Sequence, residues 1–159
     1  MEVKNIRHYL QPGKRAHLVG IGGVSMASLA EVLHGAGVEV TGSDQRESAT
    51  VLHLRSLGIP VAIGHRPESV EGACCVVRTA AVHNENPEIK AALDAGIPVF
   101  ERAQAWGAIM RDYRNALCIS GTHGKTTTTS MCTHIFMAAQ ADPTVMIGGT
   151  LPLLEAGHR

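Results

Sequence analysis

Short runs rich in valine and isoleucine alternate along this chain with amphipathic stretches of about ten residues. This alternation is the pattern of a parallel β-sheet whose strands are joined by helical crossovers. The sequence therefore predicts an α/β fold. The predicted strands cover residues 16–20, 38–42, 61–64, 73–79, 99–101, 116–120 and 144–147.

Helices are predicted between these strands from apolar residues at helical spacing and from residues that start or stop a helix. Asn86, for example, stands at a capping position before Pro87, and Gly96 with Pro98 ends the helix that follows. The predicted helices run from 26 to Gly35 or Gly37, from 51 to 57, from 86 to 96, from 103 to 111, and from the loop at 121–129 to about 139.

Residues 111–115 (RDYRN) form the most polar stretch between two predicted elements, and we place a domain boundary there. Residues 1–113 then contain a nearly complete α/β domain. Residues 114–159 contain only two predicted strands, one helix and a short tail, which is too little to bury the apolar faces of a nucleotide-binding sheet. We therefore expect the chain to be a fragment of a longer protein.

Composition excludes several function classes. Fourteen basic and 14 acidic residues cancel, and aromatic residues make up 3%, so no basic or base-stacking surface for nucleic acid is indicated. No run of 18 apolar residues predicts a membrane span, and the N-terminus has no signal peptide pattern. The four cysteines and nine histidines lack metal-ligand spacing, which favours a reducing cytoplasm and no zinc site.

The first glycine-rich loop, residues 20–26 (GIGGVSM), follows a predicted strand and opens a predicted helix. Without side chains at Gly20 and Gly22 the turn can be tight, and a diphosphate can approach the helix N-terminus. Asp44 lies at the end of the next strand, where a carboxylate can accept hydrogen bonds from a ribose. This pattern fits NAD, FAD or a nucleotide sugar equally well, and a tight turn without a ligand also remains open.

The second loop, residues 121–129 (GTHGKTTTT), follows the predicted strand 116–120. Its backbone N–H groups would face phosphate oxygens, Lys125 would neutralise the terminal phosphates of ATP, and the Thr126 hydroxyl would reach Mg²⁺. The loop is two residues shorter than the common GxxxxGK[ST] pattern. The alternative is a threonine-rich helix cap, in which a lysine would have no structural advantage.

Five stretches, HLVGIGG, TGSD, NPEI, ISGTHGKTTTT and DPTVMIGG, together resemble the Mur ligases of peptidoglycan synthesis. The short GTxGKT loop is characteristic of this family and of folylpolyglutamate synthetases, and His123 favours the branch that adds L-alanine. The resemblance extends over nearly all 159 residues. It implies a Rossmann-like, UDP-sugar-binding domain at 1–113, followed at 114–159 by the beginning of a P-loop ATPase domain.

The resemblance also implies roles for individual residues. The UDP-sugar site would be formed by Gly20, Gly22, Gly23, Asp44, His65, Thr79, Ala80 and Arg102. The ATP site would be formed by Gly121, Thr122, His123, Gly124, Lys125, Thr126 and Thr127, with Lys125 and Thr126 as catalytic residues and Thr126 as a Mg²⁺ ligand. Gly148 and Gly149 match a glycine pair near the shared phosphate site. Three residues depart from the family pattern, namely Ser25, Ser69 and Arg78.

The reaction implied is the ATP-dependent joining of L-alanine to UDP-N-acetylmuramate through an acyl phosphate. We expect catalysis by positioning and charge neutralisation, and no turnover from these 159 residues alone. Three alternatives remain open: a ligase that recycles a tripeptide onto the same sugar, a non-catalytic nucleotide-sugar-binding module, and an NAD-dependent oxidoreductase. The oligomeric state is left open.

Overall fold

The computed structural model describes residues 5–151, 153 and 156–158, which fall into two compact units. The units are Met1–Tyr113 and Arg114–Arg159, so the division lies inside the polar stretch 111–115.

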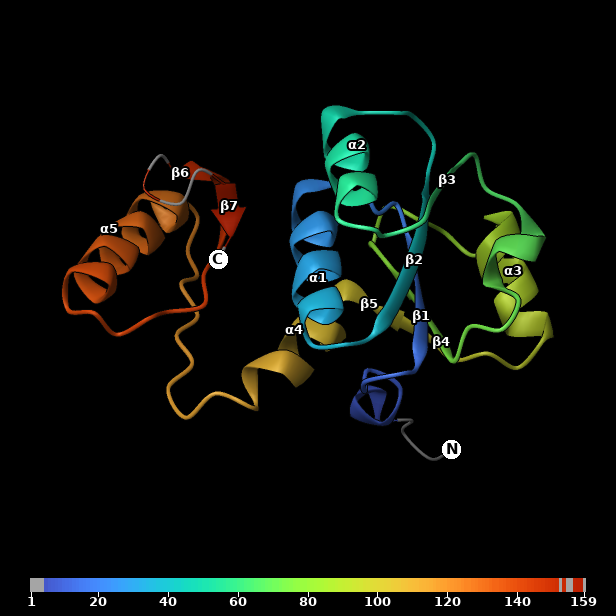
Figure 1. The fold of residues 1–159 in the computed structure, drawn as a ribbon, viewed down its shortest axis with the longest axis horizontal. Coiled ribbons are helices and arrows are strands. Elements are labelled where there is room, and N and C mark those ends of the chain that lie inside the picture. The colour runs from blue at the N-terminus through green and yellow to red at the C-terminus, as the bar shows by residue number, and fades with distance from the viewer. Residues whose placement is uncertain (1–4, 152, 154–155, 159) are drawn as a thin grey trace. The chain divides into compact units, whose positions relative to one another are not determined.

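The first unit contains a five-stranded, wholly parallel sheet with the order β3-β2-β1-β4-β5 (Figure 1). The order reverses direction between β1 and β4, which is where open α/β sheets bind ligands. The strands expected in this unit from the sequence are confirmed to within a few residues. They are β1 (Arg15–Val19), β2 (Glu39–Asp44), β3 (Val61–Ile63), β4 (Cys75–Arg78) and β5 (Val99–Glu101).

Helices cover both faces of this sheet (Figure 1). Helices α1 (Val24–Gly35), α2 (Ala49–Ser56) and α4 (Arg102–Met110) pack with one face in the larger apolar cluster, which also includes residues of the 3₁₀ turn η1 (Ile6–His8). Helix α3 (Pro87–Asp94) and the 3₁₀ turn η2 (Pro67–Val70) cover the other face in a smaller cluster. Side chains alternate along β1, so Leu18 belongs to the first cluster and Val19 to the second.

The helix starts follow the local sequence signals. The Asn86 side chain accepts hydrogen bonds from the backbone N–H groups of Glu88 and Ile89, as its position before Pro87 predicts. Ser48 caps α2 in the same way through Val51. The Asn86 cap fixes the first turn of α3, which contains the buried Glu88.

The loop after β1 packs tightly on β2 because β2 carries a glycine at that point. A Cβ atom added to Gly42 would lie 2.6 Å from Ile21 Cδ1 and 2.6 Å from the Leu18 carbonyl oxygen. No side chain fits at that distance, so Gly42 permits the close approach of the first glycine-rich loop to the sheet.

The second unit contains helix α5 (Lys125–Ala138) and a two-stranded antiparallel sheet of β6 (Met146–Leu151) and β7 (Ala156–His158). The expected strand at 144–147 appears as β6, beginning two residues later. The strand expected at 116–120 is wrong, because these residues form no ladder with another described strand. Leu117 there is 64% exposed, whereas the apolar residues of β1 in the first unit are buried.

Candidate functional site

The residues expected to bind a UDP sugar all lie at one edge of the parallel sheet. Each group follows or ends a different strand: the loop 20–23 follows β1, Asp44 ends β2, His65 follows β3, residues 79–80 follow β4, and Arg102 follows β5. Because the carboxyl ends of parallel strands lie at the same edge, the topology places along that edge eight residues that are scattered over 83 positions of sequence, from 20 to 102, with His65 after the outer strand β3 and Arg102 after the opposite outer strand β5. This edge also contains the reversal of strand order.

The first glycine-rich loop is held to β2 by its own backbone. The N–H groups of Gly20 and Ile21 donate to the Ser43 carbonyl oxygen at 2.8 and 3.0 Å, and the Gly22 N–H donates to Asp44 Oδ2 at 2.8 Å. The Gly23 N–H donates to the Gly20 carbonyl at 3.2 Å. These donors are therefore already used, and a diphosphate at this loop would be met by the first turn of α1.

Asp44 has a structural task that the sequence did not reveal. Its Oδ2 accepts from Gly22, its Oδ1 accepts from the Arg46 N–H at 3.3 Å, and a Cβ on Gly22 would lie 2.9 Å from Oδ2. A carboxylate has further acceptor positions, so contact with a ribose is compatible with this arrangement. Asp44 thus holds the loop in the shape that a ligand would meet.

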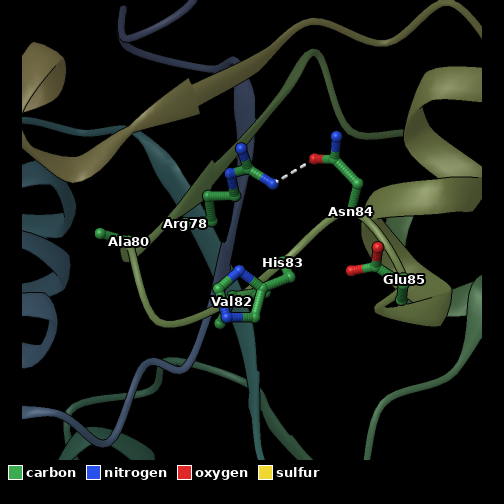
Figure 2. A pocket seen from close by; sticks show the side chains of 6 residues that line it. All are labelled: Arg78, Ala80, Val82, His83, Asn84 and Glu85. Carbon is green, nitrogen blue, oxygen red and sulfur yellow. Dashed lines mark hydrogen bonds between the residues drawn. The ribbon is translucent and has the colours of Figure 1, made fainter.

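The turn after β4 borders a shallow pocket, which Figure 2 shows from close by. Arg78, one of the departures from the family pattern, is fixed beside it: Nε donates to Glu101 Oε1 at 2.9 Å, and Nη1 donates to Asn84 Oδ1 at 2.6 Å. Thr79 Oγ1 accepts from the Ala81 N–H at 3.2 Å, which shapes the turn. The pocket is lined by Arg78, Ala80, Val82, His83, Asn84 and Glu85.

Arg102 is the first residue of α4 and is partly exposed. The helix start is organised by its neighbour Glu101, whose N–H donates to Gln104 Oε1 at 2.7 Å. In the part of the chain that the structure describes, no ion pair includes Arg102. Its charge is therefore not neutralised by a carboxylate at this sheet edge.

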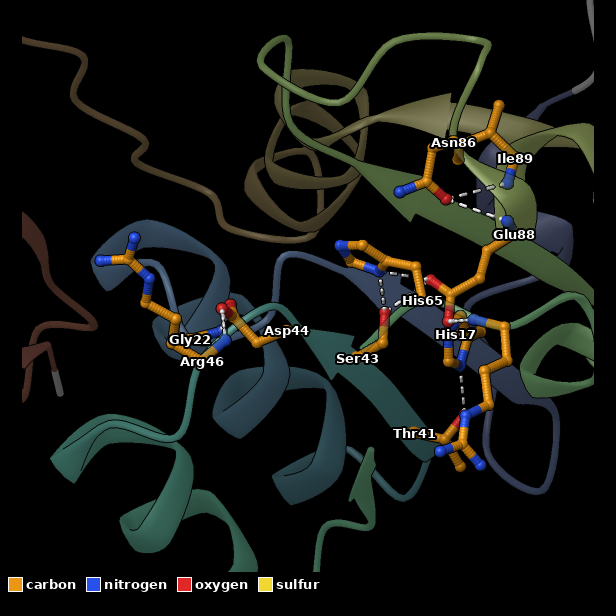
Figure 3. Close-up of polar contacts among 11 residues, drawn as sticks. His17, Gly22, Thr41, Ser43, Asp44, Arg46, His65, Asn86, Glu88 and Ile89 are labelled. Atoms are coloured by element: carbon orange, nitrogen blue, oxygen red, sulfur yellow. Dashed lines mark hydrogen bonds and ion pairs between the residues drawn. The ribbon is translucent and has the colours of Figure 1, made fainter. Parts of the chain in front are cut away.

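A buried polar cluster lies under the same edge, on the face covered by α3 (Figure 3). We call it the Glu88 cluster; it consists of Glu88, His17, Thr41, Ser43 and His65. Ser43 Oγ donates to Glu88 Oε2 at 2.5 Å, and His65 Nδ1 lies 3.1 Å from the same oxygen. His17 Nε2 lies 3.6 Å from Glu88 Oε1, an ion-pair distance longer than a hydrogen bond, and its Nδ1 lies 2.9 Å from Thr41 Oγ1.

Glu88 is completely buried, yet its surroundings favour the carboxylate form. Burial alone raises the pKa of Glu88, but contacts with His17 and with the hydroxyl groups of Ser43 and Ser69 outweigh it and lower the pKa from 4.5 to about 2. The Arg66 N–H also donates to Oε1 at 3.4 Å. Glu88 is therefore an anion throughout the physiological pH range.

His65, which the resemblance assigns to the UDP-sugar site, follows β3 at the carboxyl edge of the sheet, and His17, Ser43 and Glu88 were not anticipated as a group. One signal could have suggested them. His17 interrupts an apolar strand at a position that faces α3, and a buried polar strand residue requires a partner. Which residue would supply that partner depends on the packing of α3 and cannot be read from spacing.

The loop that begins at Gly121 in the second unit leads directly into α5. Gly124 caps this helix with φ +79°, and Gly121 has φ +155°, two backbone conformations that L residues rarely adopt. Lys125 Nζ donates to the carbonyl oxygens of Gly121 at 2.5 Å and Thr122 at 3.2 Å. Lys125 thus closes over the loop, and its ammonium group lies at the N-terminus of a 14-residue helix, a favourable site for phosphate.

The threonine run has two parts. The hydroxyl groups of Thr129 and Ser130 donate to backbone carbonyls four residues earlier, at 2.8 and 2.9 Å. Thr126 and Thr127, in the first turn of α5, are exposed. The donor set at this helix start fits a polyphosphate, and the Thr126 hydroxyl fits a single Mg²⁺ contact.

Within 5–151, 153 and 156–158, no three histidine, cysteine, aspartate or glutamate side chains gather so that they could hold a metal ion. Over the same ranges, no helix has the length and apolar character that crossing a membrane requires.

Comparison with known proteins identifies relatives over most of the chain. UDP-N-acetylmuramate–L-alanine ligase of Neisseria gonorrhoeae is 54% identical over 135 residues, which are 85% of this chain and 29% of that protein. The enzyme of the same name from Legionella pneumophila is 48% identical over 153 residues, which are 94% of this chain and 32% of that protein. The chain thus spans about a third of the length of these curated relatives.

Solved structures give the same result for the fold. The UDP-N-acetylmuramate–alanine ligase of Thermotoga maritima matches with a TM-score of 0.84 at 32% identity, covering 91% of this chain and 34% of that one. The UDP-N-acetylmuramate:L-alanyl-γ-D-glutamyl-meso-diaminopimelate ligase of Neisseria meningitidis matches with a TM-score of 0.84 at 30% identity, covering 92% and 46%. The model of the Mur ligase family, catalytic domain, matches residues 15–114, so the chain belongs to the Mur ligase family.

Proposed function

We propose that this chain binds UDP-N-acetylmuramate and contributes the phosphate loop of an enzyme that joins L-alanine to that sugar with ATP, in the cytoplasm. The observation that carries the proposal is the convergence of the expected UDP-sugar residues on one edge of the parallel sheet. The 54% identity to the UDP-N-acetylmuramate–L-alanine ligase of Neisseria gonorrhoeae supports the choice of substrate.

In the first unit, the site would lie across the reversal of strand order. The first turn of α1 would receive the diphosphate beside the loop 20–23, and Asp44 would hold the loop and accept from the ribose. His65, the turn at Thr79 and Ala80, and Arg102 would complete the pocket. Arg102 supplies the positive charge, whereas Arg78 is already paired with Glu101.

In the second unit, the loop 121–127 would hold the ATP phosphates. Mg²⁺, when bound, neutralises phosphate charge during phosphoryl transfer. Lys125 would move its ammonium from the loop carbonyls to the phosphates, and Thr126 would offer its hydroxyl to the ion. Gly148 and Gly149, which lie in β6, would stand near the same phosphates, as the family pattern implies.

We further propose that the 159-residue chain binds its ligands without turnover. The chain spans 29% to 34% of the relatives named above that act on alanine, and ligation needs an amino-acid site that we assign to none of its residues. Release of phosphate that depends on both ATP and L-alanine, measured with the purified chain, would contradict this proposal.

Two other functions are considered, and ligand binding distinguishes only the second of them from the proposed one. A ligase that recycles a tripeptide would bind the same UDP sugar and differ only in its acceptor; the likeness to the Neisseria meningitidis ligase keeps it as the second candidate. An NAD-dependent oxidoreductase would use the first loop and leave the second without a role.

Calorimetric titration of the chain with UDP-N-acetylmuramate, NAD and Mg-ATP tests the proposal. Saturable binding of the UDP sugar and no binding of NAD is the expected result. Binding of NAD without the UDP sugar would exclude the family function. If the chain binds the UDP sugar but does not bind Mg-ATP, the result would favour a nucleotide-sugar-binding module.

A further inference from the structure

Burial of the Glu88 cluster opposes folding. Removing a carboxylate and two imidazole rings from water costs free energy that apolar residues of similar volume would not require. Ser43 is completely buried, which excludes it as a nucleophile, and Glu88 is equally inaccessible to substrate. A chemical role for the cluster must therefore act through its one member that reaches the sheet edge, His65.

The hydrogen positions in the cluster follow from its acceptors. Ionised Glu88 can only accept, and its Oε2 receives the Ser43 hydroxyl at 2.5 Å. His65 Nδ1 lies 3.1 Å from this oxygen and 3.0 Å from Ser43 Oγ. Since Ser43 has given its hydrogen to Glu88, both neighbours of Nδ1 present lone pairs. Nδ1 must therefore carry the hydrogen of the imidazole, and Nε2 is the ring nitrogen turned away from the cluster (Figure 3).

His17 supports Glu88 from the opposite side. Its ring is 2% exposed, its Nδ1 is 2.9 Å from Thr41 Oγ1, and its Nε2 faces Glu88 Oε1 at 3.6 Å. The carboxylate is thus held between the two histidines, with the Arg66 N–H as a further donor to Oε1. Rotation of the Glu88 side chain would break several contacts at once.

Ser43 links this cluster to the first glycine-rich loop. Its side chain bonds Glu88, while its backbone carbonyl accepts the N–H groups of Gly20 and Ile21 at 2.8 and 3.0 Å. One residue therefore fixes both the loop and the carboxylate that orients His65. Any displacement of Ser43 would move the two parts of the candidate site together.

We propose that Glu88 is a positioning residue for UDP-sugar binding, which holds the His65 imidazole with Nδ1 inward and Nε2 toward the ligand. This inference rests on the proposed function, because it takes the ligand of His65 to be the UDP sugar. Glu88 does not touch the ligand itself. Its contribution is to select one tautomer and one ring orientation at a fixed place relative to the glycine loop.

The imidazole ¹⁵N chemical shifts of His65 test the inference directly, because they distinguish the two tautomers. The His65 signals are identified by their loss in His65→Asn. In the unchanged chain we expect the Nδ1–H tautomer, and on addition of UDP-N-acetylmuramate we expect the Nε2 signal to shift. An Nε2–H tautomer in the unchanged chain would overturn the inference, and this measurement requires no variant to fold.

Glu88→Gln supplies the second arm. The glutamine amide has one acceptor oxygen, whereas the carboxylate has two. On one side of the cluster, the NH₂ group of the amide would therefore point at donors that now bond a carboxylate oxygen. We expect His65 to lose its single tautomer and UDP-N-acetylmuramate affinity to fall about tenfold to hundredfold. Glu39→Gln, an exposed carboxylate in β2, is the matched control and should change neither.

The outcomes separate the inference from the proposed function. A Glu88→Gln chain that keeps both the tautomer and the affinity would refute the positioning role while leaving UDP-sugar binding intact. If the unchanged chain does not bind UDP-N-acetylmuramate at all, the proposed function fails and the inference fails with it.

Discussion

The buried carboxylate of Glu88 predicts how the stability of the first unit depends on pH. Contacts with His17, Ser43 and Ser69 lower the pKa of Glu88 from 4.5 to about 2, and the side chain is completely buried. At 1.36 kcal/mol for each pKa unit, this difference corresponds to about 3 kcal/mol of unfolding free energy. That is a large share of the stability of an ordinary domain.

Acid should destabilise the first unit through protonation of Glu88. Because the pKa is lower in the folded chain than in the unfolded chain, the folded state gains from an ionised Glu88. The contribution is complete above the unfolded value of 4.5 and is lost as the pH falls from there to about 2. Glu88→Gln should therefore lower the unfolding free energy more at pH 7 than at pH 2. The loss caused by the substitution should be about 3 kcal/mol greater at pH 7.

Trp106 provides a probe for this measurement. It is the single tryptophan of the chain, lies in α4, and packs against the larger apolar cluster of the first unit. Its fluorescence in urea titrations should report the unfolding of that unit alone. The unchanged chain, Glu88→Gln and the control Glu39→Gln would each be unfolded at several pH values between 2 and 7.

A pH-independent difference in unfolding free energy between the unchanged chain and Glu88→Gln would contradict this prediction. It would mean that the carboxylate is not preferentially ionised in the folded state. A similar pH dependence in Glu39→Gln would also contradict it, because the effect would then reflect general charge and not the cluster.

Two further predictions concern the phosphate loop and the packing of the first loop. Lys125→Met should lower the affinity for Mg-ATP about tenfold to hundredfold, because charge-assisted hydrogen bonds to the phosphates are lost. The control Lys90→Met, which replaces an exposed lysine in α3, should leave this affinity unchanged. Equal Mg-ATP affinities of the unchanged chain and Lys125→Met, measured by calorimetry, would exclude a phosphate role for Lys125. Gly42→Ala should destabilise the first unit by about 1–3 kcal/mol, because its Cβ would meet Ile21 and Leu18 at 2.6 Å. The control Gly107→Ala should instead stabilise the first unit by about 0.5–1 kcal/mol, because Gly107 lies in helix α4 with open space where the Cβ would go. Urea titrations that find the same effect for both substitutions would contradict this packing.

The sheet of the first unit was predictable because its signals are local. Parallel strands buried on both faces read as short apolar runs, and the helices between them carry caps such as Asn86. The strand at 116–120 failed because a strand needs a neighbour to bond with, and the described residues supply none. An apolar run by itself does not reveal whether that neighbour exists.

The candidate site was predictable in its location but not in its internal bonding. Spacing placed Asp44 beside the glycine loop, since the carboxyl ends of neighbouring parallel strands adjoin. That Asp44 bonds the Gly22 N–H depends on the shape of the loop. The pairing of Glu88 with His17 and His65 depends on how α3 crosses the sheet, which joins residues up to 71 positions apart, from 17 to 88.

We expect UDP-N-acetylmuramate to bind at the carboxyl edge of the parallel sheet. Backbone amide chemical shifts, recorded while the UDP sugar is added, would locate its binding site. The shifts should concentrate at the ends of the five strands, at Gly20, Asp44, His65, Thr79 and Arg102. Shifts confined to the amino edge of the sheet, or a response to NAD and none to the UDP sugar, would contradict this expectation.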